Sequence, residues 1–277
     1  MGRKLGMFDR KATPFFACQK DQRFSYCLYI PSNYQEEGDD RRPLVVVLHG
    51  TARTAAPYRD NWIPFAEETG AVILSPLFPA HIIDPEDTDN YKLIRYHDIR
   101  YDHVFLSMVD EVAATYRVHA DRFLLHGFSG GGQFANRFFF LHPHRLQAVS
   151  IGAPGMVTLL DESRDWWVGV RNIQEQFGTA LDLAAMRRAQ VQMVVGADDT
   201  QTSEITIQPD WSYWWMEGAN SAGVTRIDRL QALRRSFETH GIAVRFDLVP
   251  GIGHAGMPVQ DTVRDFFRKV LVGRSNA

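Results

Sequence analysis

The residues with the clearest chemical signature are Gly127-Phe128-Ser129-Gly130-Gly131, a Gly-x-Ser-x-Gly pattern centred on Ser129. A serine hydroxyl becomes a useful nucleophile only when a neighbouring base takes its proton. This pattern places the serine on a sharp turn between a strand and a helix, so the hydroxyl stands clear of the sheet. The turn crowds the backbone, so positions 127 and 131 require small residues. We therefore predict Ser129 as a catalytic nucleophile.

The flanks of the pattern favour this order of strand, turn and helix. Residues 122–126 form a short, mostly apolar run that is typical of a strand. Residues 133–141 carry apolar side chains at helical spacing and contain no proline. The sequence on both sides therefore supports the turn at Ser129.

A base and an acid that could activate Ser129 follow it in the chain. A strand expected at 244–249 leads into a glycine-flanked loop that carries His254. A strand expected at 191–195 ends in Gly-Ala-Asp-Asp, which makes Asp198 and Asp199 competing candidates for the acid. Catalytic groups in open α/β sheets lie at the carboxyl ends of strands. We predict His254 as the general base and one of the two aspartates as its orienting carboxylate, while the other caps the following turn.

Two backbone N–H groups are expected to stabilise the negative charge that develops on the attacked carbonyl oxygen. One is the N–H of Gly130, which follows the nucleophile and begins the expected helix. The second comes from the loop after an expected strand at 44–48, which reads His-Gly-Thr-Ala. We predict Thr51 as this second donor.

The elements that must position these residues alternate along the chain. Strands buried on both faces are expected at the apolar runs 44–48, 71–74, 148–151, 191–195 and 244–249. An antiparallel hairpin is expected from residues 13–18 and 24–30. Helical apolar spacing appears at 227–237 and 259–270. We therefore predict an α/β fold with a mostly parallel, twisted sheet and helices on both faces. The length favours a single domain spanning residues 1–277.

One stretch breaks the alternation. Residues 155–188 are too long for a simple crossover and indicate an insertion or lid near the carboxyl edge of the sheet. This stretch carries one aromatic cluster, and a second follows the next expected strand. Either the tryptophans pack as core beneath the loops, or one or two of them line an acyl pocket. The tryptophans concerned are Trp166, Trp167, Trp211, Trp214 and Trp215.

Composition excludes several other classes of protein. The net charge of −3 has both signs spread along the chain, which argues against nucleic acid binding. No run approaches the ~20 apolar residues of a membrane span, and no signal peptide is visible, so we expect a cytoplasmic protein. Cys18 and Cys27 are expected to be free thiols. No metal-binding or P-loop spacing occurs, and the polar run 97–102 is interpreted as capping and salt-bridge structure.

Taken together, these residues resemble the α/β-hydrolases over roughly residues 24–272, and among them the polyhydroxybutyrate depolymerase and feruloyl-esterase-like serine esterases. The resemblance rests on the segments 43–50 and 121–131, on Gly196-x-x-Asp199, and on Gly253-His254. It implies ester hydrolysis through an acyl-enzyme without a cofactor, and its spacing favours Asp199 over Asp198 as the acid.

The function that we expect is therefore a serine hydrolase acting on a small-molecule carboxylic ester. An acyltransferase or a peptidase could use the same fold and triad, because the acceptor is selected by pocket shape. A binding protein that has lost catalysis is a third reading, which the presence of Ser129, His254 and Asp199 disfavours. No pattern in the sequence indicates an oligomeric state.

Overall fold

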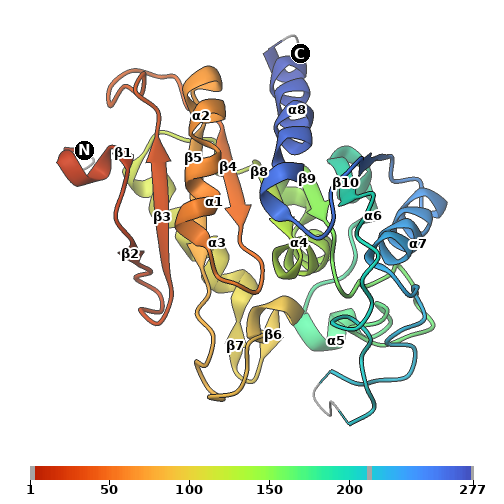
Figure 1. Cartoon of the computed structure of the whole chain (residues 1–277). Coiled ribbons are helices and arrows are strands. Elements are labelled where there is room, and N and C mark those ends of the chain that lie inside the picture. The colour runs from red at the N-terminus through yellow and green to blue at the C-terminus, as the bar shows by residue number, and fades with distance from the viewer. Residues whose placement is uncertain (1–3, 211–213, 276–277) are drawn as a thin grey trace.

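The computed structural model describes residues 4–210 and 214–275. These residues form a nine-stranded sheet whose main path runs in the order β1-β3-β5-β4-β8-β9-β10-β11 (Figure 1). β3 is antiparallel to β5, whereas all neighbours from β5 to β11 are parallel. The bounds are β1 Lys11–Ala12, β2 Phe16–Ala17, β3 Ser25–Ile30, β4 Leu44–Leu48, β5 Val72–Leu77, β8 Phe123–Phe128, β9 Leu146–Gly152, β10 Gln190–Gly196 and β11 Val244–Val249.

The predicted strands are present, but the expected burial of 244–249 on both faces is wrong, because β11 lies at the edge of the sheet and its residues are partly exposed. Burial explains the composition of the inner strands. Every residue of β4 and β8 is buried, because each strand lies in the middle of the sheet with helices over both faces. Uniform runs such as Leu-Val-Val-Val-Leu suit this environment, since neither face of the strand meets water. The predicted N-terminal hairpin is present, but its first arm is broken into β1 and β2 around Pro14, which has no N–H to donate to the ladder.

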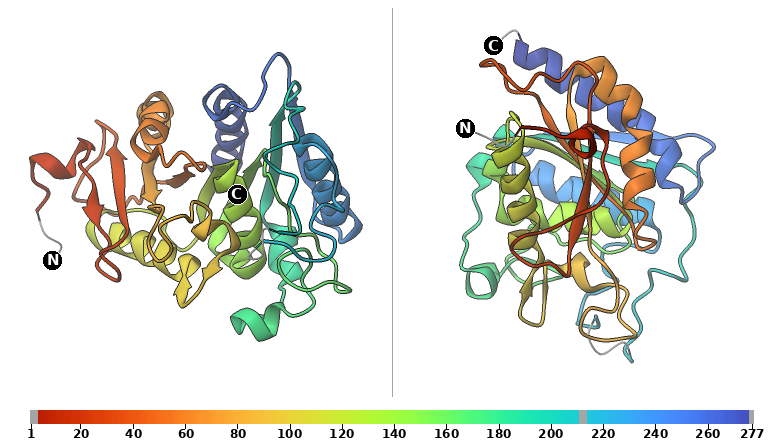
Figure 2. Two further views of the ribbon diagram at one scale, coloured as in Figure 1. Left: turned by 60° about the horizontal axis from the view of Figure 1, so that its bottom comes forward. Right: turned by 90° about the vertical axis from the view of Figure 1, so that its left-hand side faces the viewer.

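Helices cover both faces of the sheet, as predicted. On one face, α1 (Ala55–Asn61), α2 (Ile63–Thr69) and α8 (Gly256–Ser275) lie together (Figure 2), and the rings of Trp62 and Phe267 are 5.6 Å apart. On the other face lie α3 (Tyr101–Thr115), α4 (Gly130–Leu141) and α7 (Arg226–Thr239). There Phe105 packs on Phe138 at 4.9 Å, and Phe140 packs on Phe237 at 5.8 Å.

The segment predicted as an insertion, between β9 and β10, packs against the body of the molecule. It contains two short helices, α5 (Ile173–Phe177) and α6 (Leu183–Arg188), joined by irregular chain. Asn136 of α4 receives the Thr158 N–H at 2.8 Å, and the Arg137 guanidinium donates to the Thr158 hydroxyl at 2.9 Å. These buried bonds hold the start of the insertion over α4, close to the carboxyl ends of the strands.

Several sequence expectations concern smaller features. Cys18 and Cys27 are free and buried. Within the described ranges, no helix combines the length and apolar character needed to cross a membrane. In those same residues, no cluster of three histidine, cysteine, aspartate or glutamate side chains could hold a metal ion.

Two residues of the polar run 97–102, Arg100 and the buried Asp102, form an ion pair rather than a helix cap. Asp102 has no exposed side-chain surface, and it accepts hydrogen bonds from Arg100 at 2.7 Å and His142 at 2.8 Å. No side chain caps the start of α3, so the capping half of the interpretation is wrong and the salt-bridge half is confirmed. Burial alone would raise the pKa of Asp102, but the bonds from His142 and Arg100 outweigh it and lower the pKa to about 2.

This ion pair predicts a stability change that depends on pH. Because the folded pKa of Asp102 lies below the unfolded value, its contribution is present above about pH 4 and is lost as the pH falls toward 2. Asp102→Asn should lower the free energy of unfolding by about 3 kcal/mol at pH 6, since Arg100 loses its buried partner. Urea unfolding at pH 6 and at pH 3 checks this: the difference from wild type should shrink at pH 3. An equal difference at both pH values would contradict it.

Candidate active site

Ser129 lies in the tight turn between β8 and α4, at the carboxyl edge of the sheet. Its backbone has φ 55° and ψ −115°, a region that residues with side chains rarely adopt. A Cβ at Gly127 would lie 2.1 Å from the Gly131 carbonyl oxygen, and one at Gly131 would lie 2.6 Å from that of Leu48. The glycines of the motif are therefore required by close backbone contacts, and the turn presents the Ser129 side chain away from the strand.

The structure brings three of the predicted residues into one hydrogen-bonded chain. The imidazole Nε2 of His254 lies 3.0 Å from the Ser129 hydroxyl, and its Nδ1 lies 2.7 Å from Oδ2 of Asp199. Both distances are within the range in which a base can take a proton and a carboxylate can orient that base. The ring of His254 packs on Phe128, with the centroids 5.1 Å apart, which restricts the orientation of the imidazole.

The two competing aspartates have different surroundings. Asp199 is buried at the end of β10 and faces His254, whereas Asp198 is exposed and its N–H donates to the Ile252 carbonyl at 2.9 Å. Asp198 therefore helps to hold the loop that carries His254 through its backbone. Burial raises the pKa of Asp199, but the bond from His254 and the charge of Arg226 together lower it below its usual value.

The two predicted N–H donors lie next to each other beside Ser129. A Cβ at Gly130 would be 3.3 Å from the Thr51 nitrogen, and a Cβ at Gly50 would be 3.4 Å from Cβ of Ser129. Gly130 is the first residue of α4, where backbone N–H groups have no acceptor within the helix. These positions suit a site for a developing oxyanion between Gly130 and Thr51.

A residue that the sequence analysis did not assign, His49, holds the loop that carries Thr51. Its Nε2 accepts the Phe78 N–H at 3.1 Å, so its Nδ1 carries the proton that bonds to the Gly50 carbonyl at 2.8 Å. Complete burial lowers the pKa of His49 to about 4, so the ring stays neutral near pH 7. The His-Gly dipeptide after the strand was the available sequence signal for this role.

Ser129 and His254 open into a cavity of about 570 Å³ whose lining is largely polar. Lys92 is one of its buried side chains, and it pairs with Asp89; burial lowers the pKa of the Lys92 ammonium, and Asp89 opposes that change. A smaller extension of about 60 Å³ adjoins this cavity, and both polar and apolar side chains line it. The apolar ones are Met156, Ile205, Ile207 and Trp214.

The predicted pocket tryptophans do not act as a group. Trp166 packs on Phe177 at 4.7 Å, and Trp167 is buried in a second apolar cluster with its Nε1 donating to the Trp214 carbonyl. Neither lines the cavity beside Ser129, so for these two the core-packing alternative describes the structure. Trp214 lines the small extension and Trp215 is partly exposed, while Trp211 lies outside the described residues.

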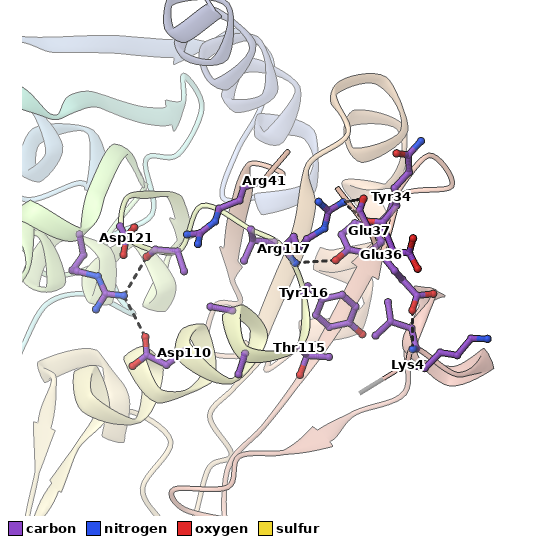
Figure 3. Close-up of a pocket in the computed structure, with 17 residues that line it drawn as sticks. Lys4, Tyr34, Glu36, Glu37, Arg41, Asp110, Thr115, Tyr116, Arg117 and Asp121 are labelled. Atoms are coloured by element: carbon purple, nitrogen blue, oxygen red, sulfur yellow. Dashed lines mark hydrogen bonds and ion pairs between the residues drawn. The ribbon is translucent and has the colours of Figure 1, made fainter. Parts of the chain in front are cut away.

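A larger hollow of about 1200 Å³ lies at the opposite end of the sheet, near the starts of β4 and β8 (Figure 3). Its walls include Arg117, whose guanidinium donates to the backbone carbonyls of Gln35 and Glu37, and Arg145, which pairs with Asp110. These cations are engaged in local structure, and the described residues that line the hollow include no serine or histidine. The chemistry of the sequence motifs is therefore concentrated at the smaller cavity.

Together, the sheet order and the strand–serine–helix turn define an α/β-hydrolase fold, and solved structures agree. No protein-family model matches the chain, and no curated protein sequence matches it. A poly(3-hydroxybutyrate) depolymerase from Bordetella parapertussis is 23% identical, with a TM-score of 0.72 over 93% of this chain and 89% of that one. Poly(aspartic acid) hydrolase-1 from Sphingomonas sp. KT-1 is 21% identical, with a TM-score of 0.73 over 92% and 98%. An S-formylglutathione hydrolase from Agrobacterium tumefaciens is 17% identical, with a TM-score of 0.57 over 90% and 89%.

Proposed function

We propose that this protein is a serine hydrolase that cleaves carboxylic esters through an acyl-enzyme. The observation that supports this most strongly is the hydrogen-bonded chain from Asp199 through His254 to Ser129, which ends in an open cavity. His254 takes the Ser129 proton as the hydroxyl oxygen attacks the ester carbonyl. The N–H groups of Gly130 and Thr51 stabilise the oxyanion, and the leaving alcohol receives the proton from His254.

The second half of the reaction repeats these roles with water. His254 takes a proton from water, the hydroxide attacks the acyl group on Ser129, and the acid leaves as the serine is protonated again. The names of the similar structures, a depolymerase of poly(3-hydroxybutyrate) and an S-formylglutathione hydrolase, support a reaction at an acyl carbonyl. An alcohol or amine acceptor in place of water would make the same intermediate serve acyl transfer.

A fluorophosphonate probe tests the nucleophile directly. It should label the wild-type protein at Ser129 and should not label Ser129→Ala. Turnover of p-nitrophenyl butyrate should disappear in the same variant. Added primary alcohol then separates the two reactions, because a hydrolase releases mainly free acid whereas an acyltransferase forms mainly a new ester. An unlabelled and inactive wild-type protein would contradict the proposed function.

The small extension beside the cavity predicts a preference for short acyl chains. Each methylene that it accommodates should add about 0.8 kcal/mol, roughly fourfold in kcat/KM. With about 60 Å³ available, kcat/KM should rise from acetate to butyrate and then level off or fall at hexanoate. A series of p-nitrophenyl esters measures this. A steady rise through octanoate would show that the chain binds elsewhere.

Trp214→Ala should move this optimum toward hexanoate, because it removes one wall of the extension. Trp166→Ala is the matched control, since Trp166 packs on Phe177 and should affect stability without changing chain preference. An unchanged optimum in Trp214→Ala would place the acyl group outside the extension.

A further inference from the structure

The aspartate of the triad has a second charged partner that the proposed mechanism does not use. Arg226, the first residue of α7, places its Nη1 3.0 Å from Oδ1 of Asp199, the oxygen that does not face His254. Both side chains are buried, at 3% and 0% exposure. The Arg226 guanidinium therefore holds one oxygen of the Asp199 carboxylate, and the His254 imidazole holds the other. These two bonds leave the carboxylate little room to rotate.

The start of α7 is built to keep Arg226 in this place. The Thr225 hydroxyl accepts the Asp228 N–H, and the Asp228 carboxylate accepts the Thr225 N–H, so this capping box fixes the first turn. Arg226 itself lines the cavity, and its Nη2 donates to Glu204 at 3.2 Å. Arg229, one turn further, is instead bound by backbone carbonyls such as that of Ile205.

We propose that Arg226 is a positioning residue for the triad acid: it fixes the rotation of the Asp199 carboxylate and offsets part of its charge. This inference rests on the proposed function. With Oδ1 bound by the guanidinium, Oδ2 is left to accept the His254 Nδ1–H. A second cation beside the carboxylate also weakens its attraction for a protonated imidazole. Loss of the Arg226 charge should therefore be visible in the pH profile of the enzyme.

Charged groups near this pair come from several segments, and Asp89 and Lys92, which pair with each other, line the same cavity. From the loop after β10, Asp199 and Glu204 face Arg226, and Asp198 is exposed beside them. From α7 come Arg226 and Arg229, and from the loop after β11 comes His254. The Glu204 side chain is 67% exposed, so its ion pair with Arg226 is largely screened by solvent. Asp199 is thus the partner that dominates the environment of Arg226.

Arg226→Gln tests the inference through the pH profile. We expect kcat to fall about tenfold with KM little changed, well short of the ~10⁴-fold loss expected when the carboxylate itself is removed. In the profile of kcat/KM against pH, the midpoint of the acid limb should shift to a pH about 1 unit higher, because Asp199 then stabilises the protonated base more strongly. Arg226→Lys should return the limb to its wild-type position, yet kcat should stay reduced since lysine lacks the planar guanidinium fork.

Arg235→Gln is the matched control, since Arg235 lies exposed on the same helix and the substitution removes the same charge. Rates are divided by the number of sites that a fluorophosphonate probe titrates, so loss of folded protein does not count as loss of catalysis. A titratable Arg226→Gln enzyme with a wild-type pH profile would overturn the inference. If that variant does not fold, a wild-type kcat in Arg226→Lys would overturn it instead. Neither result would contradict the proposed function, as long as the wild-type enzyme is active and is labelled by the probe.

Discussion

Ser129→Ala is expected to lower kcat for p-nitrophenyl butyrate by about 10⁶-fold. The methyl group of alanine cannot form the acyl-enzyme, and His254 then has no hydroxyl 3.0 Å from its Nε2 to activate. The turn itself should survive, because its geometry depends on Gly127 and Gly131 rather than on the serine hydroxyl. Stopped assays with enough enzyme to detect background rates measure the loss, and far-UV circular dichroism checks the fold.

The residues of a triad act as a unit, which gives this prediction a second test. His254→Ala added to Ser129→Ala should cost almost nothing further, since the base has no remaining proton to move. Ser163→Ala is the control for serine replacement, because Ser163 is exposed and its hydroxyl donates to the nearby Asp161 carboxylate at 2.6 Å. Retention of a substantial fraction of turnover in Ser129→Ala would assign the nucleophile to another residue.

Asp199→Asn is expected to lower kcat by about 10⁴-fold, whereas Asp198→Asn should leave it within a few fold of wild type. An asparagine at 199 can present an amide to Nδ1 and so hold the imidazole in the wrong tautomer. Asp198 has an exposed side chain and contributes to the loop through its backbone N–H, which asparagine retains. The opposite ranking would assign the acid to Asp198.

This comparison needs one further measurement. Asp199→Asn also leaves Arg226 without its buried partner, so the variant should lose stability as well as activity. Thermal unfolding therefore accompanies the kinetics, and kcat is reported per fluorophosphonate-reactive site. A loss of stability with normal kcat per site would make Asp199 structural.

Much of the fold and of the candidate site could be predicted from sequence because the signals are local. The turn at Ser129 needs a strand, a crowded backbone and a helix within a short stretch, and each leaves its own pattern in residues 122–141. Strands buried on both faces favour apolar runs, and such runs predict β4 and also β10, where only Gln192 interrupts residues 191–195. The role of His254 could be predicted from its place after the last strand, since parallel strands end at one edge of the sheet.

Only the tertiary structure shows which way each side chain points and which distant residues it contacts. Asp198 and Asp199 are adjacent in sequence, and only the course of the turn after β10 points Asp199 inward and Asp198 to solvent. Arg226 lies 27 residues beyond Asp199, a separation that carries no periodic signal. Trp167 was equally compatible with core and pocket, because a tryptophan buries its ring wherever the surrounding loops close over it. The sequence determined which groups could do chemistry, whereas packing between distant segments determined which of them meet.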